Sequence, residues 1–263
     1  MLDLKVALVQ TSVFWEDKEA NLKHFGNLLS QVEPNTDLVI LPEMFNTGFS
    51  MKSESLFETM SGETVSWMKK QATKLNAVIT GSVIIKEDGK FYNRLLWVTP
   101  AGNTSFYDKR HLFRMGEEDQ HYSAGKERRV FELKGWRLMP QVCYDLRFPV
   151  WSRNTVNELV EFEYDVVFYA ANWPQRRIHH WDALLKARAI ENQSYVLAVN
   201  RIGLDGMGID YPGHSSVIDP LGEIIAWNER AETILYASLS KKALNEYRDL
   251  FPAWKDADGF SVG

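Results

Sequence analysis

The feature that most constrains the fold is a series of short, continuous apolar runs that are rich in β-branched residues. Such runs predict strands. Because they are continuous rather than alternating, both faces of each sheet should be covered. The runs span residues 6–9, 38–41, 78–85, 95–98, 138–143, 166–170 and 195–199.

Amphipathic stretches lie between several of these runs and predict helices. Apolar residues recur at helical spacing within 22–32, 65–75 and about 180–193. Strands interleaved with helices indicate a layered α/β fold. Residues 78–98 contain two strands with no room for a helix between them, so the sheets should be mixed. No repeat or linker divides residues 1–263, and one domain is therefore predicted.

Composition excludes several classes of function. The formal net charge of −5 disfavours a nucleic-acid partner. No apolar run approaches the length of a membrane span, and no signal peptide is expected. Cys143 is the only cysteine, which rules out an intramolecular disulfide and a cysteine-rich zinc site and fits a reducing cytoplasm. The histidines lack metal-binding spacing, so no metal ligand is predicted.

Three polar residues follow apolar or strand-like runs: Glu43, Lys109 and Cys143. Side chains at strand ends of α/β folds converge on a crevice. A cysteine attacks carbonyl carbon as the thiolate, and a carboxylate can take the thiol proton. A lysine and the backbone N–H of Tyr144 could stabilise the oxyanion, each such donor contributing ~2.7–4 kcal/mol. The pattern indicates hydrolysis through a thioester.

The segments 41–44, 107–112 and 142–149, which contain these three residues, resemble the signature blocks of the nitrilase (carbon–nitrogen hydrolase) superfamily. The order matches, and so do the spacings of 66 and 34 residues between Glu43, Lys109 and Cys143. The resemblance extends along nearly the whole chain, through 171–174, 187–193, 200–203 and 213–223.

This resemblance implies a four-layer α-β-β-α sandwich with two mixed sheets, formed by a single carbon–nitrogen hydrolase domain that pairs into a homodimer. It also implies hydrolysis of non-peptide C–N bonds without a metal or organic cofactor. Family members often use a second glutamate beside the lysine. Glu118 is the expected residue here, and Glu117 is the alternative.

Residues 109–115 are most similar to the omega-amidase branch. That branch implies release of ammonia from ω-amides of 2-oxo dicarboxylates, such as 2-oxoglutaramate and 2-oxosuccinamate. The alternatives are nitriles, N-carbamoyl compounds, deaminated glutathione, acyl transfer to an acceptor other than water, and a catalytically silent domain. An arginine should hold the substrate carboxylate, and Arg114 and Arg176 are the candidates. Phe113, Tyr144 and Trp173 could form an aromatic wall, although core packing explains Trp173 equally well.

Two local ion pairs are also expected. Asp145 and Arg147 should pair with each other and fix the loop after the nucleophile, since buried charges need partners, and substrate binding by these two residues is the alternative. Arg188 and Glu191, spaced i and i+3 on a predicted helix, should pair within it. The aromatic stretch 247–254 either crosses a dimer interface or closes the protein's own core.

Overall fold

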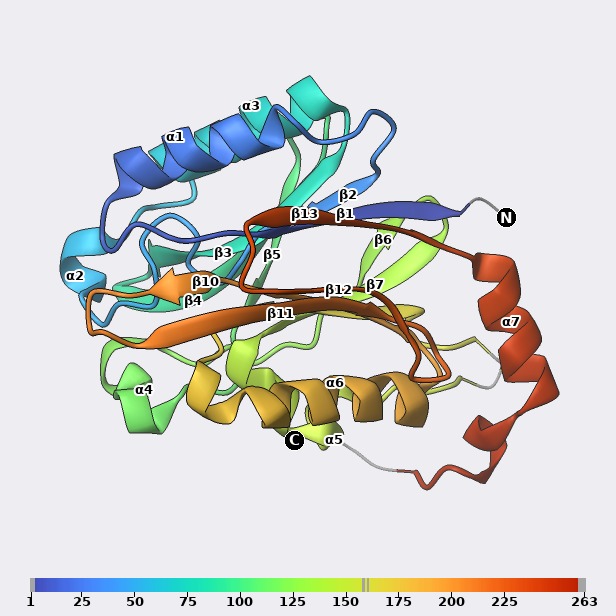
Figure 1. Ribbon diagram of the computed structural model, residues 1–263. Helices are drawn as coiled ribbons and strands as arrows, with labels where there is room; N and C mark the ends of the chain where they lie inside the picture. Colours follow the sequence, from blue (N-terminus) through green and yellow to red (C-terminus); the bar gives the residue numbers. More distant parts are fainter. Residues whose placement is uncertain (1–2, 158, 160, 260–263) are drawn as a thin grey trace.

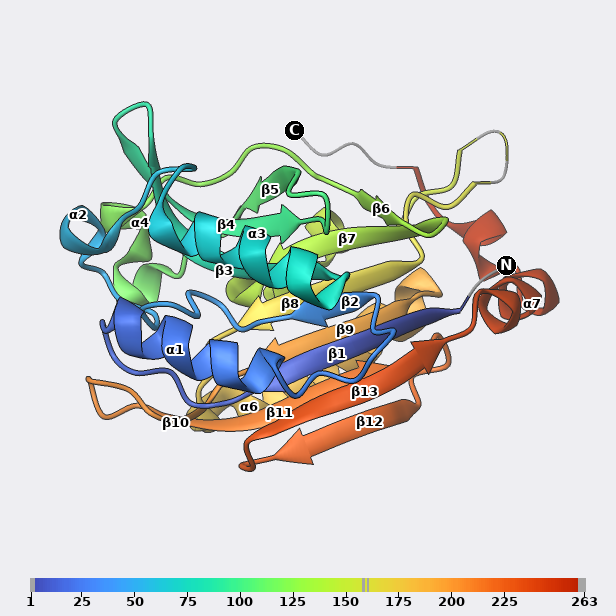
Figure 2. The same ribbon diagram turned by 90° about the horizontal axis from the view of Figure 1, so that it is seen from above.

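Two β-sheets lie face to face between two layers of helices in the computed structural model, which describes residues 3–157, 159 and 161–259 (Figures 1 and 2). The first sheet has six strands, in the order β13 (Thr233–Leu239), β1 (Leu4–Gln10), β2 (Leu38–Ile40), β3 (Val78–Glu87), β4 (Lys90–Val98) and β5 (Thr104–Asp108). Its central strands β1, β2 and β3 are parallel, and the outer strands pair antiparallel.

The second sheet has seven strands and the same mixed character. Its order is β10 (Ile202–Leu204), β11 (Asp210–Ile218), β9 (Tyr195–Asn200), β8 (Val166–Ala171), β7 (Trp136–Val142) and β6 (Phe131–Leu133), and β12 (Ile224–Glu229) also pairs with β11. Strands β7, β8 and β9 are parallel. Their carboxyl ends therefore lie at one end of the sandwich.

Helices cover the outer face of each sheet (Figure 1). Helices α1 (Lys18–Leu29) and α3 (Glu63–Leu75) lie over the first sheet, and α6 (Ile178–Asn192) lies over the second. Helix α7 (Lys241–Leu250) lies at the end of the sandwich opposite α2 (Ser53–Leu56) and α4 (Glu118–His121). The short helices are α2 (Ser53–Leu56), α4 (Glu118–His121) and α5 (Pro149–Ser152), and the 3₁₀ turns are η1 (Arg114–Gly116), η2 (Cys143–Arg147), η3 (Gln175–Arg177) and η4 (Ala253–Asp256).

Three apolar layers hold these elements together. Val6, Ile40 and Phe168 are among the residues buried between the two sheets. Phe25 and Met68 pack α1 and α3 onto the first sheet, and residues of α6 that include Leu185 pack onto the second. Burying one such side chain contributes roughly 1.5–3 kcal/mol, so these layers supply much of the stability.

The predicted α/β class, with two mixed sheets in a four-layer α-β-β-α sandwich, is confirmed. Each predicted strand range contains a strand, and each predicted helix is present. Helix α1 begins earlier than predicted, at Lys18, because the Asp17 carboxylate caps it by accepting from the backbone N–H of Ala20 at 3.0 Å. The prediction misses β6, β10, β11, β12 and β13. The longest of these, β11, includes Pro212 and Gly213 and lacks a continuous apolar run.

The C-terminal stretch packs on its own chain through Arg248. This buried guanidinium donates to Asp165 and to the carbonyl of Tyr164, both at 3.0 Å.

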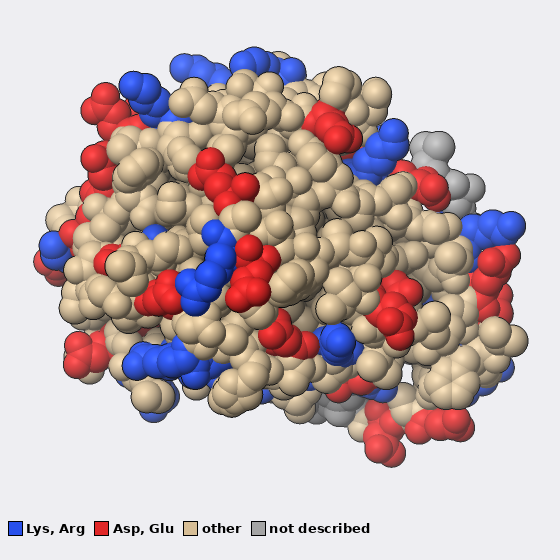
Figure 3. Space-filling model, viewed as in Figure 1, with Lys and Arg blue, Asp and Glu red and all other residues tan. Residues whose placement is uncertain are grey.

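Acidic and basic side chains are interspersed on the face of the molecule that Figure 3 shows. Within the described part of the chain, no helix combines the length and the apolar character that a membrane crossing requires.

Candidate active site

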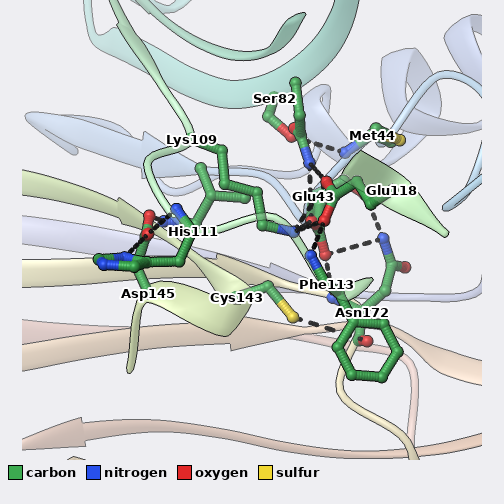
Figure 4. Close-up of polar contacts among 12 residues, drawn as sticks. Glu43, Met44, Ser82, Lys109, His111, Phe113, Glu118, Cys143, Asp145 and Asn172 are labelled. Atoms are coloured by element: carbon green, nitrogen blue, oxygen red, sulfur yellow. Dashed lines mark hydrogen bonds and ion pairs between the residues drawn. The ribbon is translucent and has the colours of Figure 1, made fainter. Parts of the chain in front are cut away.

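Glu43, Lys109 and Cys143 converge at one end of the sandwich (Figure 4). Each follows a strand: Glu43 comes after β2, Lys109 directly after β5, and Cys143 directly after β7. All three line the same cavity, which has a volume of about 490 Å³. The structure therefore brings together the three residues that the sequence pattern selects.

Lys109 lies between two buried carboxylates. Its Nζ donates to Oε1 of Glu43 at 2.9 Å and to both oxygens of Glu118 at 3.0 and 2.9 Å. All three side chains are at most 1 % exposed. Glu117, the alternative, is exposed at the rim of the cavity. Of the two candidates, Glu118 is the glutamate that contacts Lys109.

Two asparagines hold these carboxylates in place. The side-chain amide of Asn93, on β4, donates to Glu43 at 2.8 Å and to Glu118 at 3.2 Å. The backbone N–H of Asn172, directly after β8, donates to Glu43 Oε2 at 2.9 Å. Neither role was predicted from the sequence. Asn172 lies in segment 171–174, which resembles the superfamily, and this could have indicated a role. Nothing in the sequence around Asn93 indicates one, except that a polar amide stands within a strand.

Cys143, the predicted nucleophile, lies on a sharp turn in the backbone. Cys143 has a φ of 44°, in the left-handed region that non-glycine residues rarely adopt, and it therefore ends β7. Its Sγ lies 3.8 Å from the carbonyl oxygen of Asn172. The side chain is half-buried, so a substrate in the cavity can reach the sulfur.

Asp145 fixes this turn, and the expected pairing of Asp145 with Arg147 is wrong. Asp145 accepts from the backbone N–H of Val142 at 3.0 Å, from the Tyr107 hydroxyl at 2.8 Å and from the backbone N–H of His111 at 2.9 Å. Arg147 instead donates through Nη2 to Nδ1 of His180 at 3.0 Å. The tight η2 turn directs the two side chains to different neighbours, which residue spacing does not reveal.

The charges set the resting protonation state. Burial raises the pKa of the Cys143 thiol well above its ordinary value, and the Glu43 carboxylate raises it further, against the opposing effect of Lys109. Burial alone would lower the pKa of Lys109, but Glu118 and Glu43 raise it overall. Burial also raises the pKa of Glu118, with Lys109 opposing. The site thus rests with a neutral thiol and a charged lysine.

Comparison with known proteins decides the family. The family model described as carbon-nitrogen hydrolase matches residues 5–249. This chain belongs to the carbon–nitrogen hydrolase family. The predicted membership is confirmed, and so is the assignment to enzymes that hydrolyse C–N bonds.

Relatives of this carbon–nitrogen hydrolase include enzymes named for ω-amide hydrolysis. It is 49 % identical over 263 residues to the omega-amidase YafV of Escherichia coli strain K12, covering 100 % of both chains. It is 32 % identical over 254 residues to a 2-oxoglutaramate amidase of Bacillus subtilis, covering 95 % of this chain and 96 % of the relative. These likenesses support the omega-amidase branch.

A solved structure matches along the whole length. The crystal structure of XC1258 from Xanthomonas campestris, a CN-hydrolase superfamily protein with an arsenic adduct in its active site, superposes with a TM-score of 0.98. The two chains are 47 % identical, and each is covered completely. The fold of this hydrolase is therefore that of its family.

The cavity wall contains most, but not all, of the expected substrate-binding residues. Phe113, Tyr144, Trp173 and Arg176 line it. Arg114 does not: its side chain is 86 % exposed and lies 3.8 Å from Asp119 on the outer surface. The η1 turn points this side chain away from the cavity, so we drop Arg114 from the candidates.

Two further arginines, Arg147 and Arg177, also line the cavity. Substrate binding by Arg147 was the less favoured alternative to its pairing with Asp145, and Arg177 was not predicted. The position of Arg147 close to Cys143 in the sequence, and that of Arg177 directly after the proposed Arg176, are the features that could have indicated these two residues.

Across residues 3–157, 159 and 161–259, no group of three or more histidine, cysteine, aspartate or glutamate side chains is arranged to hold a metal ion.

Proposed function

We propose that this hydrolase releases ammonia from ω-amides of 2-oxo dicarboxylates, with 2-oxoglutaramate and 2-oxosuccinamate as substrates. The observation that carries the proposal is the convergence of Glu43, Lys109 and Cys143 in one arginine-lined cavity. The relatives named omega-amidase and 2-oxoglutaramate amidase support the same substrate class.

In the first half of the proposed reaction, the Cys143 sulfur attacks the amide carbon while Glu43 takes the thiol proton. The oxygen becomes negative, and the Lys109 ammonium and the backbone N–H of Tyr144 stabilise it. Glu43 then returns the proton to the leaving nitrogen. The C–N bond breaks, ammonia departs and a thioester remains on Cys143.

In the second half, water replaces ammonia in the site. Glu43 takes a proton from the water while the water oxygen attacks the thioester carbon. The second oxyanion that forms is stabilised by the same two donors, the Lys109 ammonium and the backbone N–H of Tyr144. The C–S bond breaks, the proton returns to the sulfur, and a dicarboxylate leaves. Glu118 does not touch the reacting atoms in this scheme. It holds Lys109 and balances its charge, since an uncompensated buried cation would be costly.

We also infer that the chain forms a single domain, that two copies pair into a homodimer, and that the enzyme works in the cytoplasm. The superfamily resemblance supports the dimer. The need for a reduced Cys143 supports a reducing compartment. Light scattering with size-exclusion chromatography would give the mass in solution, and a monomer at micromolar concentration would contradict the dimer.

The test of the activity is ammonia release from a panel of amides by the wild type and Cys143→Ala. We expect rapid release from 2-oxoglutaramate and 2-oxosuccinamate by the wild type, and none by a folded Cys143→Ala. Turnover by the variant would contradict the nucleophile. If no ω-amide reacts while Cys143 can still be alkylated, the substrate lies among nitriles, carbamoyl compounds or peptide-derived amides.

A further inference from the structure

Two guanidinium groups face the cavity of Cys143 without a carboxylate partner. Arg147 comes from the η2 turn and Arg177 from the η3 turn, and both are half-buried in the cavity lining. In the part of the chain that the structure describes, neither side chain makes an ion pair with an aspartate or glutamate. Half-buried cations that lack a counter-charge are suited to an anionic ligand.

Each guanidinium lies against an aromatic ring that also faces the cavity. The Cζ atom of Arg147 is 4.8 Å from the ring centroid of Trp173, and that of Arg177 is 5.0 Å from the centroid of Phe113. Stacking fixes the plane of a guanidinium and leaves the N–H groups at its edge free to donate. The aromatic wall is therefore also the support for the two cations.

These aromatic residues are tied to the catalytic residues. The backbone N–H of Phe113 donates to Glu118 at 2.6 Å. Trp173 directly follows Asn172, which holds Glu43, and its indole N–H donates to the carbonyl of Arg177 at 2.8 Å. The chain segments that carry the two rings are thus hydrogen-bonded to the catalytic residues and to the η3 turn.

Two of the acids that line the same cavity, Glu16 and Asp205, bind other partners. Glu16 accepts from the Lys52 ammonium at 2.7 Å and from the Ser50 hydroxyl at 2.6 Å. Asp205 accepts from the Tyr211 hydroxyl at 2.9 Å and from backbone N–H groups. Neither neutralises the arginines. Burial lowers the pKa of Arg177, and the neighbouring charges of Arg176 and Arg147 lower it further, which reflects the crowding of positive charge.

We propose that Arg147 and Arg177 together bind the carboxylate that lies at the opposite end of the substrate from the reacting amide, and that His180 is a positioning residue for Arg147. This inference rests on the proposed ω-amidase function. It identifies the residues that select a carboxylated amide over an uncharged one.

His180 can hold Arg147 only as an acceptor. Its Nδ1 accepts from Nη2 of Arg147 at 3.0 Å, so Nδ1 carries no proton and the neutral ring has its proton on Nε2. Burial and the charges of His179, Arg147 and Arg177 lower the pKa of His180, which favours this neutral form. The hydrogen bond and the Trp173 ring together restrict Arg147 to one orientation.

The first test compares two amides that share a five-carbon chain: glutaramate, which has a distal carboxylate, and pentanamide, which has none. For Arg177→Gln and Arg147→Gln we expect KM for glutaramate to rise roughly 10- to 100-fold with little change in kcat. The kcat/KM for pentanamide should stay within about twofold of the wild type. Arg177→Lys, which keeps the charge but not the planar fork, should fall between.

His180 is tested with a matched pair of variants. His180→Phe removes the acceptor and should raise KM for glutaramate while leaving pentanamide unaffected. His180→Asn places an amide oxygen near the former Nδ1 and should restore much of the loss. Arg129→Gln, which alters an exposed ion pair with Glu127 outside the cavity lining, is the control that should change neither substrate.

Equal losses for glutaramate and pentanamide in the arginine variants would overturn the proposal, because such losses would place the arginines at the reacting atoms or in the fold. A second measurement does not depend on turnover. Glutarate should protect wild-type Cys143 from alkylation by iodoacetamide, and Arg177→Gln should weaken that protection at least tenfold. Unchanged protection would also overturn the proposal. Failure of the ω-amidase function would instead leave the wild type inactive on all ω-amides.

Discussion

Asn172 joins the two sheets through Glu43. Its backbone N–H donates to a carboxylate oxygen of Glu43 at 2.9 Å, and its side-chain amide donates to the main-chain carbonyl of Glu43 at 2.8 Å. Glu43 follows β2 of the first sheet and Asn172 follows β8 of the second. The Glu43 carboxylate is therefore fixed from both sheets, and its position depends on how they pack.

Replacing Asn172 should impair catalysis in a graded way. Asn172→Ala keeps the backbone N–H and loses the side-chain donor. The main-chain carbonyl of Glu43 then lacks this partner, which should lower the free energy of unfolding by ~1–3 kcal/mol. Asn172→Asp also places a negative charge near Glu43, since the amide nitrogen lies 3.4 Å from Glu43 Oε2. We expect kcat for 2-oxoglutaramate to fall further in the Asp variant. Equal kcat values would show that the added charge is not felt by Glu43.

Glu43→Gln should make Cys143 easier to alkylate at a given pH while it abolishes turnover. Burial and the Glu43 carboxylate raise the pKa of the thiol, whereas Lys109 lowers it. Glu43→Gln removes a negative charge, so the midpoint of the pH profile for iodoacetamide alkylation should move to lower pH. Turnover should nevertheless be lost, because the base is absent. A midpoint that moves to higher pH would contradict this electrostatic account.

Lys109→Met should abolish turnover and destabilise the protein. The substitution leaves Glu43 and Glu118 buried without their shared cation, and breaking a buried pair in this way costs ~3–5 kcal/mol. Urea unfolding should show this loss. Adding Glu118→Gln to Lys109→Met should recover part of the stability by removing one carboxylate, but it should not restore activity. No recovery would mean that Glu118 is already neutral in the single variant.

Glu118 and Glu117 provide a matched comparison of adjacent residues. Glu118→Gln weakens the contacts at 3.0 and 2.9 Å that hold the Lys109 ammonium, so kcat should fall at least tenfold. Glu117→Gln changes an exposed side chain and should have a small effect. Steady-state kinetics on 2-oxoglutaramate would check both variants. A larger loss with Glu117→Gln would reverse the assignment.

Asp145→Asn should weaken both the fold and the catalytic turn. The carboxylate accepts from Val142, Tyr107 and His111 at 2.8–3.0 Å, and a single amide oxygen cannot replace both carboxylate oxygens. We expect a loss of ~1–3 kcal/mol in the free energy of unfolding and a lower kcat. Asp119→Asn, whose nearest ion pair spans 3.8 Å on the surface, is the control and should change stability little.

Local features of the sequence were sufficient for the long helices over the sheets, for the central strands of both sheets and for part of the site. Continuous apolar runs predict buried strands, because a strand covered on both faces needs apolar residues at every position. The Arg188–Glu191 pair, at 2.9 Å, is confirmed because helical geometry alone brings positions i and i+3 together. Glu43, Lys109 and Cys143 could be selected because each follows a strand in a recognisable block.

Contacts between distant segments could not be selected in this way. The sequence left Glu117 and Glu118 as alternatives, and only the direction of the chain into α4 buries one and exposes the other. It also paired Asp145 with Arg147, whereas the turn after Cys143 sends them to different partners. The side chains of residues that are close in sequence point in different directions because their backbone dihedral angles differ, and tertiary packing sets those angles.

The sequence by itself thus determined the family, the layered fold and the residues proposed to react, since these depend on local pattern and order. The tertiary structure decided what surrounds them. Asn93 reaches Glu43 across 50 positions within the first sheet, and Asn172 reaches it across 129 positions from the second sheet. The first contact exists only once the strands of one sheet are assembled, and the second only once the two sheets are packed. The same packing places Arg147 and Arg177 in one cavity, because it fixes the η2 and η3 turns against Trp173 and Phe113.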